Sequence, residues 1–181
     1  MIWLASLLCT LFAHCAAVEA PPQQAVTPEA ATMAVAVPLV ARWEGLKTTA
    51  YLDRIAVPPV WTICYGETEG VRPGETRTVA QCEEGLRRGL VRYRAGISGA
   101  FTPETRSTRL PPERDAAFVS LAWNVGIAGV RNSTATRRLN AGDIHGACVA
   151  MTWWNQAGGR VVPGLENRRA DEHRLCMMGV R

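Results

Sequence analysis

The stretch from Trp43 to Thr68, WEGLKTTAYLDRIAVPPVWTICYGET, holds two carboxylates and a hydroxyl that could act together. Eight residues separate Glu44 from Asp53, and another eight separate Asp53 from Thr62. Two carboxyl groups across a cleft can break a glycosidic bond, because one protonates the leaving oxygen while the other acts on water or the sugar. Thr62 can hold that water. Spacing alone favours a helix-end cap at Glu44 and a turn aspartate at Asp53 over a catalytic pair.

Helix and hairpin signals surround this stretch. A helix is expected from Met33 to Leu46, with Glu44 near its end. From Tyr51 to Thr78, prolines and glycines punctuate short β-prone pieces, which is typical of a small hairpin sheet, and Tyr65-Gly66 supplies a turn. The pattern therefore predicts that a helix end and a hairpin present the polar groups to a common cleft.

The remainder of the chain is predicted to be helical. Thr78 to Gln81 fits a capping box before a helix that runs down to Gly99. Later helices are expected to begin at Pro111-Pro112 and after the caps Ser133 and Asp143, with a last helix through ENRRADEHRLCMM. Trp153 and Trp154 fall at helical positions and are interpreted as core rather than as sugar-stacking platforms. A hairpin lobe followed by a helical bundle is an α+β arrangement.

Composition indicates one globular domain. The chain has 181 residues, of which 48% are apolar and 20% charged. Basic and acidic residues balance at 12 each through Val130, whereas from Arg131 onward there are 8 basic and 4 acidic residues. This excess indicates either a solvated surface or attraction to an anionic polymer. Because no nucleic-acid-binding motif or dense basic run is present, a cell wall is favoured over nucleic acid.

The N-terminal segment, residues 1–18, has no Lys, Arg, Asp or Glu, and is predicted to be an export signal. Residues 19–32 read as a Pro- and Ala-rich linker, and residues 33–181 as the folded domain. The segment has no clear cleavage site and is diluted by small and polar residues. It is therefore either a cleaved signal peptide or a weak membrane anchor, and both alternatives place the domain outside the cytoplasm.

Six cysteines agree with an oxidising compartment. Two lie in the N-terminal segment, and the four in the domain are Cys64, Cys82, Cys148 and Cys176. Four cysteines in an exported domain indicate disulfides with three possible pairings, and buried free thiols are the alternative. No CxxC or CxxH spacing supports a metal site.

The active-site stretch EGLKTTAYLD…WTICYGET resembles that of the phage-type lysozymes, the endolysins of glycoside hydrolase family 24. The resemblance continues in TVAQCEEGL, AWNVGIAGVRNSTATRRLNAGD and WWNQAGGRVVPGLENRRADEHRLC. These four blocks occur in the family's order, and they cover the chain from about Val37 to Cys176.

This resemblance implies a lysozyme-like fold and a muramidase that lyses bacteria by hydrolysing the β-1,4 bond between N-acetylmuramic acid and N-acetylglucosamine. It assigns Glu44 as general acid, Asp53 as the group assisting water or the sugar cation, and Thr62 as the residue orienting that water. It implies a monomer acting on peptidoglycan without metal or cofactor. The alternatives are a lytic transglycosylase, which needs no water-directing Asp, and an inactive wall-binding domain.

Further residues are carried over from the same blocks. Thr68 and Trp123 correspond to cleft positions, and Ser133 to a contact on the far wall. The loop between Asp53 and Thr62 is longer than is usual in the family. Glu67 stands where the family has His, and we expect it to point to solvent rather than perturb a neighbouring carboxyl.

Cys64 in the predicted sheet and Cys82 in the first turn of the next helix are close in sequence, and we expect them to pair. Cys148 and Cys176 fall on the last two long helices, which the family fold packs together, so the resemblance implies the pair Cys148–Cys176. Some resembling endolysins carry a signal-arrest-release segment, which here would be residues 1–18. That segment implies an exported enzyme, periplasmic or extracellular, that is first tethered to the inner membrane and associates with it transiently.

Overall fold

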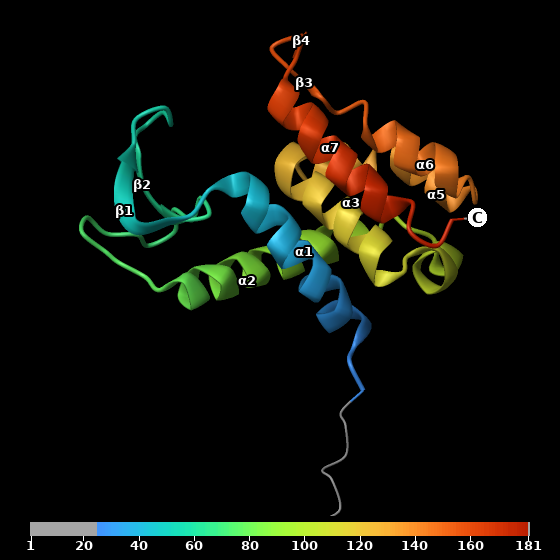
Figure 1. Ribbon diagram of the computed structural model, residues 1–181, viewed down its shortest axis with the longest axis horizontal. Helices are drawn as coiled ribbons and strands as arrows, with labels where there is room; N and C mark the ends of the chain where they lie inside the picture. The colour runs from blue at the N-terminus through green and yellow to red at the C-terminus, as the bar shows by residue number, and fades with distance from the viewer. Residues whose placement is uncertain (1–24, 181) are drawn as a thin grey trace, which may run out of the picture.

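The computed structural model describes residues 25–180, which form a small β lobe beside a larger helical lobe (Figure 1). The predicted signal segment, residues 1–18, lies outside the described residues. The helices are α1 Pro28–Glu44, α2 Val79–Ser98, the π-helical turn η1 Thr105–Arg109, α3 Pro112–Val125, α4 Ile127–Arg131, α5 Thr134–Asn140, α6 Ile144–Met151 and α7 Pro163–Cys176. The strands are β1 Lys47–Asp53, β2 Val60–Cys64, β3 Gln156–Ala157 and β4 Arg160–Val161.

Helix α1 begins earlier than the predicted Met33. The Thr27 hydroxyl accepts a hydrogen bond from the Ala30 backbone N–H at 3.2 Å, and Pro28 occupies the first helical turn, where its missing N–H costs nothing. The helix therefore includes the last residues of the segment predicted as linker. It ends at Glu44 because Gly45 adopts a φ of 68°, which turns the chain toward β1.

The β lobe is built on the predicted hairpin. Strands β1 and β2 are antiparallel, with Tyr51 opposite Thr62 and Asp53 opposite Val60. The register shifts between Lys47 and Tyr51, and an irregularity of this kind bends a strand. The segment after the hairpin closes the lobe, since the Ala50 N–H donates to the Glu75 carbonyl at 2.8 Å.

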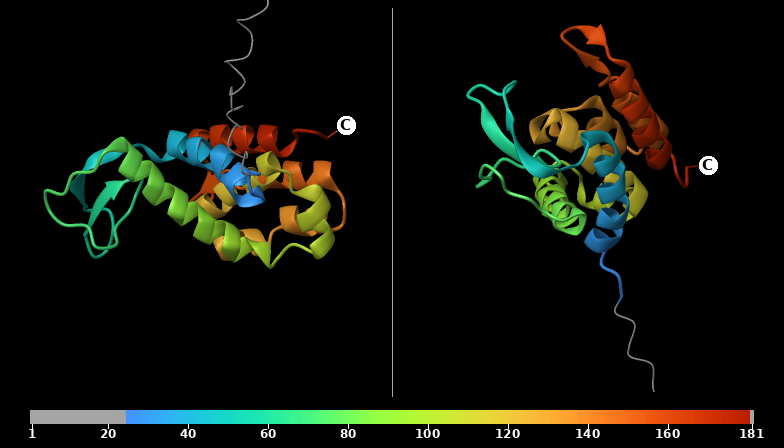
Figure 2. Two further views of the ribbon diagram at one scale, coloured as in Figure 1. Left: turned by 90° about the horizontal axis from the view of Figure 1, so that it is seen from below. Right: turned by 60° about the vertical axis from the view of Figure 1, so that its left-hand side comes forward.

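Helix α3 is the centre of the helical lobe. All of its residues from Arg114 to Ala122 are buried, and it packs against α1, α2, α4 and α7. Phe118 in its middle meets Phe101 edge-on, with ring centroids 5.4 Å apart. Helix α2 reaches from the β lobe to this bundle in both views of Figure 2 and in Figure 1. These features confirm the predicted α+β class.

The predicted helix boundaries rest on the expected caps. Thr78 and Gln81 form the reciprocal capping box of α2. Ser133 caps α5 and Asp143 caps α6 by accepting hydrogen bonds from the N–H groups of Thr136 and Gly146. Local hydrogen bonding therefore decides where these helices begin, as the sequence indicated.

A second hairpin contradicts the expectation that the chain after residue 78 is wholly helical. Strands β3 and β4 have two residues each, and Gly158 and Gly159 at the tip adopt φ values of 58° and 74°. These glycines suit a two-residue turn that needs positive φ. The preceding Trp153 and Trp154 are 55% and 37% exposed, so their interpretation as core residues is wrong. They follow the end of α6 rather than lying within it.

Two disulfides pair the four cysteines of the domain as predicted. Cys64 of β2 is bonded to Cys82 of α2, and Cys148 of α6 is bonded to Cys176 of α7. Within residues 25–180, none of the helices has the length and apolar character needed to cross a membrane.

Candidate active site

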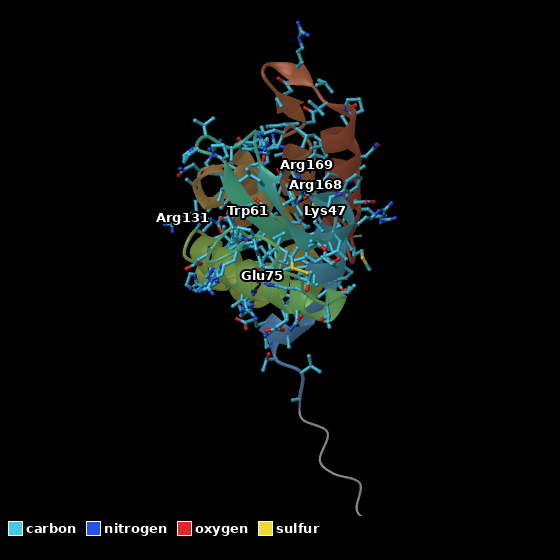
Figure 3. All side chains as sticks on the ribbon, turned by 90° about the vertical axis from the view of Figure 1, so that its left-hand side faces the viewer. Lys47, Trp61, Glu75, Arg131, Arg168 and Arg169 are labelled. Atoms are coloured by element: carbon cyan, nitrogen blue, oxygen red, sulfur yellow. A yellow bond between two sulfur atoms is a disulfide. The ribbon has the colours of Figure 1, made fainter. Side chains whose placement is uncertain are left out.

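Glu44 lies at the junction of the two lobes, where α1 ends and the chain enters the hairpin. Its side chain is 24% exposed, and its Oε1 accepts a hydrogen bond from Arg168 Nη1 at 2.7 Å. Arg168 belongs to α7 and is buried. Figure 3 looks onto the hairpin, with Lys47 at the start of β1 and Arg168 on α7 labelled. The carboxylate is thus fixed from the helical lobe while one face remains open to solvent.

A second carboxylate, that of the buried Glu172, also binds Arg168. Its Nε donates to Glu172 Oε1 at 3.4 Å, and Glu172 also receives Arg169 Nη2 at 2.9 Å and the Ser120 hydroxyl at 2.6 Å. Burial raises the pKa of Glu172, and the two guanidinium groups and the Ser120 hydroxyl act in the opposite direction. Burial also lowers the pKa of Arg169. These arginines of the basic C-terminal third are therefore interior groups rather than a solvated surface.

Asp53 is the last residue of β1 and is partly bound to its own loop. Its Oδ1 accepts hydrogen bonds from the N–H groups of Ile55 at 2.8 Å and Ala56 at 3.4 Å. This is the turn that its sequence context allowed. Both of these bonds use Oδ1, and Oδ2 makes no hydrogen bond to another group within residues 25–180. The carboxylates of Glu44 and Asp53 are thus held by different partners, Arg168 and the loop backbone.

Thr62 shares a face of the hairpin with Asp53. Residues directly opposite in an antiparallel pair point to the same side, and Thr62 faces Tyr51, two residues before Asp53. The two side chains are therefore diagonal neighbours, on the order of 7–8 Å apart between backbones. Thr62 is 4% exposed, and its hydroxyl donates to the Val60 carbonyl at 3.3 Å. The longer loop lies entirely between these strands and leaves their pairing intact.

A groove of about 990 Å³ runs between the β lobe and the helical lobe. Thr68 and Trp123 both line it, whereas Glu44, Asp53 and Thr62 are not among its lining residues. Contact of Thr68 and Trp123 with substrate stays a prediction.

The wall of the groove formed by α2 contains Gly85 and Gly89. Because these residues have no side chain, the Glu67 carboxyl packs over Gly85 and the Trp123 ring packs over Gly89. A Cβ on Gly89 would lie 2.8 Å from the Trp123 ring, which in turn packs on Tyr93 at 5.0 Å between centroids.

Glu67 does not point to solvent as predicted. Its Oε2 accepts a hydrogen bond from Arg77 Nη1 at 2.7 Å, and its carboxyl packs over Gly85, where a Cβ would lie 2.8 Å from Cδ. Arg77 Nε also donates a hydrogen bond to Glu75 Oε1 at 2.8 Å. The pKa of Glu75 is lowered, mainly by the hydrogen bond from the Arg72 backbone N–H and next by the hydrogen bond from Arg77. The carboxylate that replaces the family's His is therefore neutralised inside the groove wall by a cation.

Ser133 is the one proposed substrate contact that does not line this groove. It is 5% exposed, and its hydroxyl oxygen accepts from the Thr136 N–H at 3.0 Å. The predicted cap is observed, and the predicted contact with substrate stays a prediction.

Comparison with known proteins shows the family of this chain. The family model described as Phage lysozyme matches residues 41–172. The chain belongs to the phage lysozyme family. An SAR-endolysin of Enterobacteria phage P21 is 34% identical over 137 residues, which cover 75% of this chain and 80% of the relative. An SAR-endolysin of Pseudomonas phage phiKMV is 33% identical over 151 residues, covering 81% and 89%.

Solved structures show the same fold. The muramidase domain of SpmX from Asticaccaulis excentricus has a TM-score of 0.67 and 29% identity, covering 78% of this chain and 94% of that domain. An endolysin from Escherichia coli O157:H7 phage FAHEc1 also has a TM-score of 0.67, with 27% identity, covering 87% and 96%. This phage-type lysozyme is a glycoside hydrolase, a muramidase that lyses the bacterial cell wall.

Sequence reasoning missed the residue that holds Glu44. Arg168 is 124 positions further along the chain, and nothing in the spacing around Glu44 points to it. The Arg168-Arg169 pair inside the last resembling block gives no such signal either. Consecutive arginines on a packed helix can both be exposed, as Arg87 and Arg88 of α2 are, whereas Arg168 and Arg169 are both buried.

Proposed function

We propose that this lysozyme uses Glu44 to protonate the glycosidic oxygen, Asp53 to direct water or steady the sugar cation, and Thr62 to orient that water. The glycan strand would lie along the groove past Thr68 and Trp123. The observation that carries this proposal is the environment of Glu44. It is a carboxyl at the end of α1 that a buried guanidinium holds at 2.7 Å while the side chain stays 24% exposed.

The general-acid role is tested by replacing the carboxyl without changing its shape. Glu44→Gln keeps an acceptor for Arg168 but has no proton to donate, so we expect at least a ~100-fold loss of turnover on purified peptidoglycan. Glu83→Gln, an exposed carboxylate elsewhere on α2, is the matched control and should retain activity. Turnover of the Glu44 variant near that of the native enzyme would exclude this mechanism.

The role of Asp53 separates hydrolysis from transglycosylation. Asp53→Asn retains an Oδ1 acceptor for the Ile55 and Ala56 N–H groups, so the loop should keep its conformation. Two results together support the hydrolase: the Asp53→Asn variant loses activity, and the native enzyme releases products with reducing ends. If the variant remains active and mass spectrometry finds anhydro-muramyl ends, the enzyme is a lytic transglycosylase.

We further propose that residues 1–18 export the enzyme and tether it to the inner membrane until release. Support comes from the uncharged, weakly apolar composition of this segment and from the two relatives named as SAR-endolysins. Full-length protein should move from the membrane to the soluble fraction when the membrane is depolarised. A mature N-terminus near Val18 or Pro21 would instead show an ordinary cleaved signal peptide.

A further inference from the structure

Glu172 is a fully buried carboxylate that the proposed reaction does not use. It belongs to α7, faces α3 and has 0% exposure. Its Oε1 accepts from the Ser120 hydroxyl at 2.6 Å and from Arg169 Nη2 at 2.9 Å, and its Oε2 lies 2.8 Å from Arg169 Nε. A buried charge is costly unless it is compensated, so its retention calls for a reason.

The same carboxylate shares a guanidinium with the catalytic acid. Arg168 places Nε 3.4 Å from Glu172 Oε1 and Nη1 2.7 Å from Glu44 Oε1. Its Nη2 donates to the Ser120 carbonyl at 3.4 Å. The rigid, planar guanidinium of Arg168 therefore lies between the carboxylates of Glu172 and Glu44. Because the group is rigid, the hydrogen bond to Glu172 also fixes the position of the Nη1 atom that meets Glu44.

The charges of this cluster balance only when Glu172 is included. Arg168 and Arg169 supply two positive charges, and Glu44 and Glu172 supply two negative charges when ionised. The neighbouring elements add further charged groups: Arg42 of α1 pairs with Asp171 of α7 at 3.2 Å, and Lys47 and Asp53 lie at the two ends of β1. Without the negative charge of Glu172, Glu44 would be the only carboxylate of this cluster facing the two buried guanidinium groups of Arg168 and Arg169.

We propose that Glu172 is a positioning residue for Glu44: it holds Arg168 in register and offsets the positive charge of Arg169 behind Glu44. This proposal rests on the assignment of Glu44 as general acid. It goes beyond that assignment because it makes the protonation of Glu44 depend on a carboxylate that never meets substrate.

The direction of the effect follows from the charges. Glu172→Gln keeps an acceptor for Arg168 and Ser120 but leaves an extra positive charge one guanidinium away from Glu44. That charge favours the ionised, inactive form of Glu44, so the alkaline limb of the pH–activity profile should move down by about one pH unit. Activity on the acid side of the profile should change much less.

A second variant reverses the sign. Arg169→Gln leaves an extra negative charge, so the alkaline limb should move up. The double variant Glu172→Gln/Arg169→Gln restores the charge balance and should return the limb to its native position. Ser120→Ala is the structural control, because it removes one hydrogen bond to Glu172 without changing charge. It should lower the melting temperature and leave the limb in place.

The experiment measures pH–activity profiles of these purified full-length variants on soluble peptidoglycan fragments, with thermal melts alongside. Opposite shifts of the two single variants, cancelled in the double variant, support the proposal. An unmoved limb in both single variants overturns it, as does a limb that Ser120→Ala moves equally. If Glu172→Gln does not fold, Arg169→Gln decides alone by the presence or absence of its upward shift. Failure of the acid assignment would appear separately, as full activity of Glu44→Gln.

Discussion

Gly89 offers a direct test of whether the Trp123 ring forms a working wall of the substrate groove. In Gly89→Ala, the new Cβ would lie 2.8 Å from Trp123 Cζ3 and 3.0 Å from Cη2. Carbon atoms in good contact lie about 3.5 Å apart, so the ring must retreat by roughly 0.7 Å. Tyr93 packs on the ring at 5.0 Å between centroids, which limits where it can go and favours displacement into the groove.

The stability effect should be small because two contributions oppose each other. Replacing a glycine inside a helix by alanine stabilises by about 1 kcal/mol, whereas overpacking costs about 1–3 kcal/mol. We therefore expect a net loss of about 0–2 kcal/mol, or at most a few degrees in melting temperature. The effect on catalysis should be larger, about tenfold in kcat/KM, because misplacement of a cleft wall by even ~1 Å can cost up to ~100-fold.

Gly96→Ala is the matched control on the same helix. Its Cβ would lie 2.5 Å from Ile127 Cδ1, a clash directed at α4 and away from the groove. This variant should lose at least as much stability but keep native kcat/KM below its melting temperature. The assay is turnover of purified peptidoglycan, with circular dichroism melts. Native kcat/KM in Gly89→Ala, or an equal loss in Gly96→Ala, would refute the reasoning about Trp123.

The disulfides give a further pair of predictions. The Cys148–Cys176 bond closes 28 residues and the Cys64–Cys82 bond 18 residues, and from these loop lengths the corresponding double alanine variants should lose about 3.6 and about 3.2 kcal/mol of unfolding free energy in chemical denaturation. Only the second bond joins the strand carrying Thr62 to α2, so its removal should also reduce kcat/KM at temperatures where the protein is folded. Equal activity of the two variants would contradict that distinction.

The parts of the fold that could be predicted are those that short-range chemistry decides. Thr78, Ser133 and Asp143 each mark a helix start because their side chains bond backbone groups within three residues. The start of α1 was missed because Pro- and Ala-rich composition reads as linker, although Thr27-Pro28 is a good helix start. The β3–β4 hairpin was missed because two-residue strands have no detectable alternation.

The candidate site likewise has residues that could be predicted from the sequence and contacts that could not. Glu44, Asp53 and Thr62 could be proposed because a resembling motif places them within one stretch of chain. The ion pairs around them could not, because Arg168 and Arg77 reach their carboxylates only once helices and loops have packed. The fate of Glu67 is the clearest case. Its surroundings depend on the missing side chain of Gly85 on another element, which no local pattern around Glu67 reveals.

The placement of the two described disulfides has a mechanical consequence. Cys64–Cys82 fastens the hairpin to the first turn of α2, and Cys148–Cys176 fastens α6 to the end of α7. The first bond ties the β lobe to the start of the helix that connects the lobes, and the second lies within the helical lobe. Neither bond joins the β lobe to the far end of α2, to α3 or to α7. A change in the angle between the lobes would therefore not strain either disulfide.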